Sequence, residues 1–241
     1  MKNILNQLYQ HKKLSKPEAK QILIKIAGGA FNEAHLASFM TVFMMRPITV
    51  DELSGFREAL LELAIKVDLS DYNTIDIVGT GGDGKDTFNI STITSFVVAG
   101  TGQKVAKHGN YSVSSKSGSS DMLESFGYKF TNDEATLQSH LEKANICFLH
   151  APKFHPAMKN AAAVRKELAV PTVFNILGPL ANPAKPQAAA IGVANERMHL
   201  VMAQVLGDRG VDGFVFRGDD GLDEITLATT TSVLSIGDGS I

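Results

Sequence analysis

The sequence has little of what secreted, metal-caged or membrane-spanning proteins depend on. It contains one cysteine, Cys147, which can form neither an internal disulfide nor a cysteine metal cage and therefore suits a reducing compartment. No apolar run approaches the ~20 residues of a membrane span, and the first residues show no signal-peptide pattern. These shortages predict a soluble, cytoplasmic protein without a membrane partner.

An excess of charge of one sign is also missing. The chain carries 23 Lys and Arg against 25 Asp and Glu, a net charge of −2, with no block of like charge. This balance argues against a nucleic-acid partner and against a polybasic membrane surface. What the chain does have is 44% hydrophobic residues over 241 positions, enough for a sizeable core, and 21 glycines. Many of these glycines stand beside hydroxyl residues, which suggests an enzyme that handles phosphate.

The N-terminal part of the sequence carries helical signals and no strand signal. Capping boxes begin at Ser15 and Thr49, and an apolar-periodic run after Asn32 ends before Pro47. We therefore expect a small helical domain over residues 1–70.

From about residue 71 onward, apolar strand-like runs alternate with helical stretches. This alternation is typical of βαβ units and predicts an α/β fold, in which a mostly parallel central sheet forms a larger domain over 71–241. We expect helices within 155–185 to pack against the helical domain, and the Pro- and Gly-rich stretch 171–186 predicts a long irregular connection that acts as a hinge. Strands are expected at 74–78, 103–107, 146–149, 188–193, 211–216 and 232–236, and helices at 91–100, 133–143, 155–168 and 196–207.

A glycine-rich loop, residues 79–87, follows the first predicted strand. Its glycines let consecutive backbone N–H groups converge on an anion. The segment nearly matches the P-loop pattern, but Asp86 replaces the magnesium-binding hydroxyl, and Asp83 would repel a bare triphosphate. An acidic residue at this place suits a ligand that offers a sugar hydroxyl, or one bound through a bridging cation. The alternative interpretation of the whole loop is a flexible turn without a ligand.

Two more donor-rich segments follow along the chain. Asn89 to Thr92 places an amide and hydroxyls at a helix start, where free N–H groups favour phosphate, although an ordinary helix cap explains this segment equally well in isolation. Lys107 to Asn110 ends the next predicted strand and leads into the serine-rich stretch 111–120. Because a donor loop follows each of two strands, we expect a polyphosphate ligand.

In their order and spacing, these segments resemble the anthranilate phosphoribosyltransferase family over essentially the whole chain. Tyr111 stands where the family usually has arginine, and the chain stops soon after Asp223 and Glu224, before family members normally end. The strand at 232–236 would then leave a sheet edge exposed, so we expect a C-terminally truncated form with weak or no activity. The motifs that carry the resemblance are Gly79-Thr80-Gly81-Gly82-Asp83, Asn89-Ile90-Ser91-Thr92, Lys107-His108-Gly109-Asn110, Ser114-Ser115-Lys116-Ser117-Gly118-Ser119, His155-Pro156-Ala157-Met158-Lys159, Phe174 to Pro183 and Asp220-Gly221-Leu222-Asp223-Glu224.

The resemblance implies that the phosphoribosyl group of 5-phosphoribosyl 1-diphosphate (PRPP) is transferred to the amine of anthranilate, with Mg²⁺ as cofactor. Lys107 and Arg165 are the implied catalytic residues, and Arg165 would hold the carboxylate of anthranilate. Members of the family are commonly homodimers through the helical domain, so we expect a homodimer. The implied PRPP contacts are Gly79, Gly82, Asp83, Thr87, Asn89, Ile90, Ser91, Thr92, Lys107, His108, Gly109, Ser114, Ser115 and Ser119; the implied anthranilate contacts are Gly79, Asn110 and Arg165; and the implied magnesium ligands are Ser91, Asp223 and Glu224.

Other interpretations of these residues are open at this point. Taken alone, Asp223 and Glu224 indicate an acidic surface turn, Arg165 indicates a solvated helix surface, and His108 is either a wall of the pocket or a structural histidine. For the whole chain, one alternative is an enzyme like the pyrimidine nucleoside phosphorylases, which use inorganic phosphate and need no magnesium carboxylates. The other is a non-catalytic relative that binds nucleic acid. The acidic pair counts against the first alternative, and the net charge counts against the second.

Overall fold

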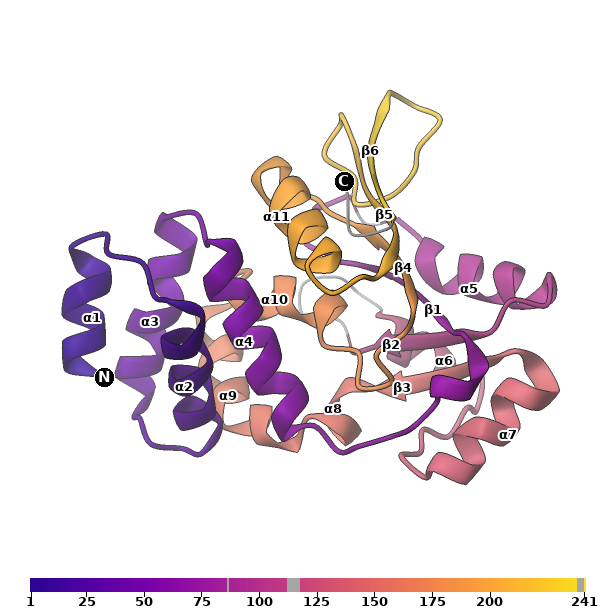
Figure 1. Ribbon diagram of the computed structural model, residues 1–241, viewed down its shortest axis with the longest axis horizontal. Helices are drawn as coiled ribbons and strands as arrows, with labels where there is room; N and C mark the ends of the chain where they lie inside the picture. Colours follow the sequence, from indigo (N-terminus) through magenta and orange to yellow (C-terminus); the bar gives the residue numbers. More distant parts are fainter. Residues whose placement is uncertain (86, 112–117, 238–240) are drawn as a thin grey trace.

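The computed structural model describes residues 1–85, 87–111, 118–237 and 241 (Figure 1). The predicted contacts Ser114 and Ser115 lie outside these ranges. Figure 1 shows a helical unit at the N-terminal end of the molecule and an α/β unit built around a sheet beside it. Among the helices of the described ranges, none has both the length and the apolar character needed to cross a membrane.

The second and fourth N-terminal helices begin at the predicted capping boxes. The Ser15 N–H and hydroxyl donate to the Glu18 carboxylate over 2.8 and 2.7 Å, and Thr49 Oγ1 accepts the Glu52 N–H over 3.2 Å. Arg46 and the buried Glu52 form an ion pair of 2.6 Å, which the sequence did not reveal and which ties the end of the third helix to the start of the fourth. The four helices are α1 (Lys2–Tyr9), α2 (Lys16–Ala27), α3 (Glu33–Met45) and α4 (Val50–Leu63).

All six predicted strand regions form strands, and the strands lie in a single sheet. They are β1 (Ile75–Gly79), β2 (Val105–Gly109), β3 (Ile146–His150), β4 (Ala188–Gly192), β5 (Asp212–Gly218) and β6 (Thr231–Ile236). Their spatial order is β3-β2-β1-β4-β5-β6. The first five strands are parallel and β6 runs antiparallel to β5, so the prediction of a mostly parallel sheet is confirmed.

The remaining helices cover the sheet and connect its strands. The predicted helix 155–168 is divided at Met158 into a 3₁₀ turn and a helix, and the stretch 171–186 is more regular than predicted because it holds a short helix and a 3₁₀ turn. The elements are η1 (Ser70–Tyr72), α5 (Ile90–Gly100), α6 (Ser119–Ser125), α7 (Glu134–Ala144), α8 (Ala151–Phe154), η2 (Pro156–Met158), α9 (Lys159–Leu168), α10 (Val173–Leu177), η3 (Gly178–Leu180) and α11 (Glu196–Gly207).

Alternate residues of the strands face two separate hydrophobic clusters, as a pleated sheet requires. Val105 and Phe148 pack with Ala99 of α5 on one face, whereas Ala106 and Leu149 pack with helix α7 on the other. Helix α11 lies on the same face as α7, against β5 and β6. Helices therefore cover both faces of the sheet over β1 to β3, as is usual for parallel strands, whereas Phe214 of β5 and Val233 of β6 remain about half exposed.

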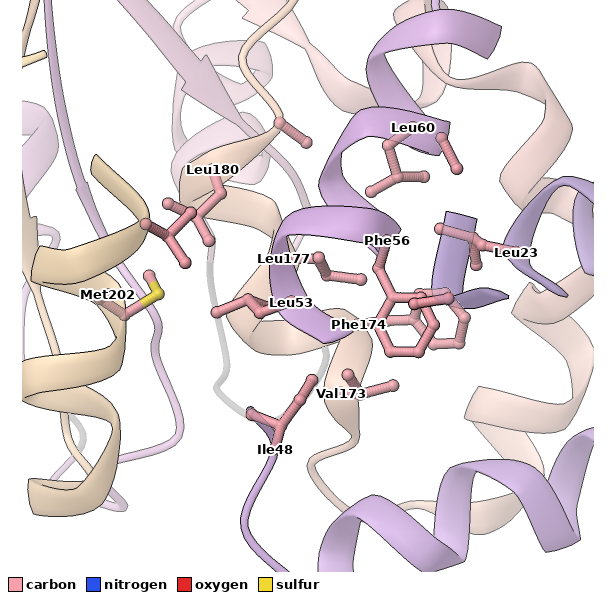
Figure 2. Packing of buried hydrophobic residues seen from close by; sticks show 14 of the residues in the cluster. Leu23, Ile48, Leu53, Phe56, Leu60, Val173, Phe174, Leu177, Leu180 and Met202 are labelled. Atoms are coloured by element: carbon pink, nitrogen blue, oxygen red, sulfur yellow. The ribbon is translucent and has the colours of Figure 1, made fainter. Parts of the chain in front are cut away.

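Helices that are far apart in the sequence share the largest core. Leu53, Phe56 and Leu60 of α4 lie next to Val173 and Leu177 of α10 (Figure 2). Helix α9 contacts α2 and α3, and α11 contacts α4. The segment 159–180 thus packs against the N-terminal helices, and this packing fixes α9 and α10 beside the carboxyl ends of the strands.

Candidate active site

A cavity of about 390 Å³ lies at the carboxyl ends of β1 and β2, between the loops that follow these strands. The chain leaves β1 toward β2 and β3 and later returns to β4 on the other side of β1. The crevice between β1 and β4 is therefore the point at which the strand order reverses, where open α/β sheets bind their ligands.

The structure brings the predicted site residues of its described part together around this cavity. They come from the glycine-rich loop, from the start of α5, from the end of β2, from α6, from α9 and from the turn after β5. Those that line the cavity are Gly79, Gly82, Asp83, Thr87, Asn89, Ile90, Ser91, Thr92, Lys107, His108, Gly109, Asn110, Ser119, Arg165, Asp223 and Glu224.

The acidic turn after β5 folds back over the ends of β1 and β4. The Asp223 carboxylate accepts the Gly81 N–H over 2.6 Å. A Cβ on Gly79 would collide with this carboxylate, and a Cβ on Gly192 would collide with the Asp223 carbonyl. The end of β4 therefore requires glycine, because backbone of residue 223 occupies the space, whereas a side chain at residue 79 would force the Asp223 carboxylate to move.

Asp223 and Glu224 form a site that favours a cation. Burial raises the pKa of Asp223, and the nearby Asp83 raises it further. Burial and the charge of Asp223 raise the pKa of Glu224 to about 7. No three His, Cys, Asp or Glu side chains of the described part are grouped as a metal cluster by themselves. Magnesium commonly takes one or two carboxylates and completes its shell with water and substrate phosphate, so the pair together with the neighbouring Ser91 hydroxyl fits this ion.

Lys107 is a buried cation at the bottom of the cavity. Its ammonium donates to the Ile77 carbonyl over 2.5 Å and to Ser91 Oγ over 3.3 Å. Burial lowers the pKa of Lys107 to about 8, and the negative charges of Asp76 and Glu224 oppose this shift. At neutral pH the ammonium is therefore charged and available to a phosphate oxygen.

Asp76 is the counter-ion that the sequence analysis missed. This buried carboxylate accepts the His108 N–H over 3.2 Å and the Asn182 side-chain amide over 2.9 Å. Burial raises the pKa of Asp76 to about 6, and the charge of Lys107 opposes the shift. The only sequence signal was an aspartate inside an otherwise apolar strand.

A second cavity of about 740 Å³ adjoins the first and lies beside α8, α9 and α10. Arg165 belongs to the border of the two cavities, and its guanidinium lies 5.5 Å from the centre of the Phe174 ring. Its Nε is buried without a hydrogen-bond partner, so Arg165 is not a solvated surface arginine. The other residues that line both cavities are His108, Asn110, Tyr111, Ala151, Phe174 and Gly178.

His108 faces the same border with an unpaired nitrogen. Its Nδ1 lies 3.1 Å from the Gly178 carbonyl and therefore carries the proton, while its buried Nε2 has no partner. Burial lowers the pKa of His108 to about 3, and the neighbouring His155 lowers it further, so the ring is neutral. Thr92 Oγ1 is also buried without a partner. Because buried polar groups are normally hydrogen-bonded, these two atoms leave the polar lining of the cavity incompletely paired.

Taken together, a donor-rich polar cavity with a buried cation and a carboxylate pair meets a wider, more apolar cavity. Such an arrangement can hold a metal-bound polyphosphate on one side and a small apolar carboxylate on the other, with their reacting atoms at the shared border. The sequence analysis did not anticipate the walls formed by Phe174 and Gly178. It interpreted their segment as an irregular connection, although both belong to a motif that carried the resemblance.

Known proteins match both units of the chain. Residues 71–241 match the α/β domain of a glycosyl transferase family, and residues 2–64 match the helical bundle domain of the same family. The anthranilate phosphoribosyltransferase of Flavobacterium johnsoniae is 57% identical over 235 residues, which cover 98% of this chain and 71% of the relative.

Solved structures of the same enzyme superpose on this fold. That of Thermus thermophilus is 35% identical with a TM-score of 0.89, over 98% of this chain and 71% of the other. That of Saccharomyces cerevisiae, in complex with PRPP and Mg, is 30% identical with a TM-score of 0.87, over 96% of this chain and 69% of the other. With sequence identity and fold in agreement over nearly its full length, the chain belongs to the anthranilate phosphoribosyltransferases of this glycosyl transferase family.

Proposed function

We propose that the chain transfers the phosphoribosyl group of PRPP to the amine of anthranilate, giving N-(5-phosphoribosyl)anthranilate and diphosphate in tryptophan biosynthesis. The observation that carries this proposal is the meeting of the two cavities at one border. Lys107 and the carboxylate pair lie on the polar side, and Arg165 lies where the more apolar side begins. The two substrates differ in the same way, because one is a diphosphate ester and the other an aromatic carboxylate.

PRPP binds in the polar cavity. The glycine-rich loop and the start of α5 offer backbone N–H groups and hydroxyls to its phosphates, and the helix N-terminus adds a positive dipole end. Asp83 accepts a hydrogen bond from the sugar, and Lys107 neutralises charge on the diphosphate as the bond to C1 breaks. The remaining PRPP contacts in this proposal are Gly79, Gly82, Thr87, Asn89, Ile90, Ser91, Thr92, His108, Gly109 and Ser119.

Ser91, Asp223 and Glu224 would hold magnesium in the polar cavity, close to Lys107. The ion supplies charge neutralisation for the leaving diphosphate. Without it, Asp223, Glu224 and Asp83 would repel the phosphates; burial and, after it, this crowding of negative charge raise the pKa values of Asp223 and Glu224. The yeast relative was solved with both PRPP and Mg.

Anthranilate binds at the border and extends into the wider cavity. Arg165 holds its carboxylate by paired charged hydrogen bonds, and Asn110 and Gly79 complete the contacts. The free Nε2 of the neutral His108 accepts a hydrogen bond from the amine, which turns the nitrogen lone pair toward C1. A neutral arylamine needs no strong base once it is aligned with an electron-deficient carbon, so positioning supplies much of the catalysis.

The test is a fluorescence assay of anthranilate consumption with PRPP and magnesium. We expect anthranilate fluorescence to fall only when PRPP and magnesium are both present. Uridine or thymidine with inorganic phosphate forms the parallel arm. Phosphorolysis there without anthranilate consumption would favour the nucleoside phosphorylase alternative, and a gel shift with DNA or RNA would favour the nucleic-acid-binding one.

We further propose that the protein is a cytoplasmic homodimer that associates through its helical unit. Tyr9 of α1 and Met44 and Met45 of α3 expose apolar side chains on this unit, which supports an interface there. Light scattering should give twice the mass of one chain. Replacing both methionines by serine should shift the mass toward the monomer, and an unchanged mass would place any interface elsewhere.

A further inference from the structure

Tyr111 lies on the border between the polar and the more apolar cavity and lines both. Tyr111 is 39% exposed as a residue, so part of its surface is open to a ligand. Arg165, which the proposed function assigns to the carboxylate of anthranilate, lines the same border from α9. An acceptor held by Arg165 therefore lies in a space that has Tyr111 among its lining residues.

The ring of Tyr111 is held at several points. Its hydroxyl donates to Glu124 on α6 over 2.8 Å. The ring also meets His150, at the end of β3, edge to face with 4.8 Å between centroids. His150 is itself fixed, because it stacks on Phe130 at 4.4 Å and bonds Ser120 Oγ over 2.9 Å. A ring fixed in this way loses little conformational entropy when a ligand packs against it.

We propose that Tyr111 is a specificity-determining residue for the acceptor, and that its ring forms the aromatic wall against which the ring of anthranilate packs. The inference rests on the proposed function, because it takes anthranilate as the acceptor. Aromatic pairs prefer offset-stacked or edge-to-face contact and gain more than area alone provides. Arg165 selects the carboxylate, and Tyr111 selects a planar aromatic ring over a saturated one of similar size.

Kinetics with Tyr111→Leu and Tyr111→Phe test the role of the ring. Because the leucine variant loses the ring, its KM for anthranilate should rise roughly 3- to 10-fold, while its KM for PRPP stays within about twofold. The phenylalanine variant keeps the ring and should stay within about twofold of the parent for both substrates. An equal rise for both substrates, or a phenylalanine variant as impaired as the leucine variant, would overturn the proposal.

Tyr72→Phe is the matched control for the loss of the tyrosine hydroxyl in Tyr111→Phe. The Tyr72 hydroxyl donates to Glu142 over 2.9 Å, much as that of Tyr111 does to Glu124, but Tyr72 lines neither cavity. We expect this variant to behave as the parent. A rise in its KM for anthranilate comparable to that of Tyr111→Leu would show that the effect does not come from the border, and would also overturn the proposal.

Inhibition by benzoate and cyclohexanecarboxylate tests ring selectivity directly. Both carry the same carboxylate, but benzoate alone is aromatic. The parent should bind benzoate more tightly when each competes with anthranilate, and Tyr111→Leu should narrow this difference by roughly 3- to 10-fold. An unchanged difference would refute the aromatic wall. If instead the parent consumes no anthranilate with PRPP and magnesium, the proposed function itself fails, so the two failures are distinguishable.

Discussion

Replacing Arg165 by alanine gives the sharpest test of how the acceptor is held. Arg165 projects from α9 to the border of the two cavities, where its Nε is buried without a partner. Losing a hydrogen bond to a charged group costs about 1.5–3 kcal/mol. If that contact holds the carboxylate of anthranilate, kcat/KM for anthranilate should fall roughly 10- to 150-fold, at about 1.4 kcal/mol for each factor of ten.

The assay follows anthranilate fluorescence while each substrate is varied with the other saturating. The loss should appear in the KM for anthranilate and leave the KM for PRPP nearly unchanged, since the polyphosphate contacts lie across the border. Arg165→Lys keeps the charge but not the planar fork, so it should lie between alanine and the parent. Arg197→Ala, on the exposed surface of α11 and outside both cavities, is the matched control and should be neutral.

Two results would refute this reasoning. An alanine variant with parental kinetics would remove Arg165 from the acceptor site. An equal rise in both KM values would mean that Arg165 stabilises the structure of the border between the two cavities, for example through its contact with the Phe174 ring. Thermal unfolding of each variant separates this second outcome from a loss of fold, because a folded variant with a general defect keeps its melting temperature.

Three further changes test the polar side of the site. Asp223→Asn combined with Glu224→Gln should leave the melting temperature nearly intact but abolish magnesium-dependent turnover, because neutral amides do not replace anionic ligands. A retained magnesium response would show that the pair does not hold the ion. The KM for PRPP should rise as the pH passes about 8, where Lys107 loses its proton. Asp76→Asn should move this rise to lower pH, because it removes the negative charge that raises the pKa of Lys107. A KM for PRPP that stays flat to pH 9 would contradict this prediction. Gly79→Ala should lower both activity and melting temperature, since its methyl group would collide with the Asp223 carboxylate. An active, equally stable variant would show that the Asp223 carboxylate can move aside without loss of function.

The regular elements were predictable because their signals are local. Capping boxes at Ser15 and Thr49 mark helix starts that depend on side chains three residues away, and the strands are short apolar runs between turn residues. The direction of β6 was not predictable from its pattern, because parallel and antiparallel strands at a sheet edge look alike in sequence. The connection over 219–230 is short and irregular, which suits an antiparallel return better than a crossover through a helix.

The stretch 171–186 shows where local signals mislead. Its prolines and glycines are typical of loops, yet Val173 to Leu177 form a helix of five residues. A helix this short is unstable alone and forms here because its apolar side chains are buried against α4. Figure 2 shows Val173 and Leu177 beside Leu53 and Phe56 from a helix more than a hundred residues earlier. Tertiary burial therefore outweighs local propensity in this segment.

In the candidate site, too, the residues in continuous segments were predictable, whereas those that depend on contacts distant in the sequence were not. The donor-rich loops that line the polar cavity were predictable because each is continuous in the sequence, and the carboxylates, Arg165 and the proposed acceptor contacts followed from the resemblance. Asp76 could not be recognised in the same way. Its partner Asn182 lies 106 residues further along the chain, and the need for a counter-ion becomes clear only when Lys107 is found to be buried.

The glycines at the strand ends show how strongly the position of the acidic pair depends on distant residues. Gly79 and Gly192 are paired in the sheet at the crevice between β1 and β4, and Asp223 fills the space above both. From the sequence, Gly79 belongs to a phosphate-binding loop and Gly192 is a small residue at the end of a strand. In the fold, both are small because the carboxylates must reach the centre of the sheet. A methyl group at either position would displace Asp223, so these glycines position the proposed cation site although neither of them is one of its proposed ligands.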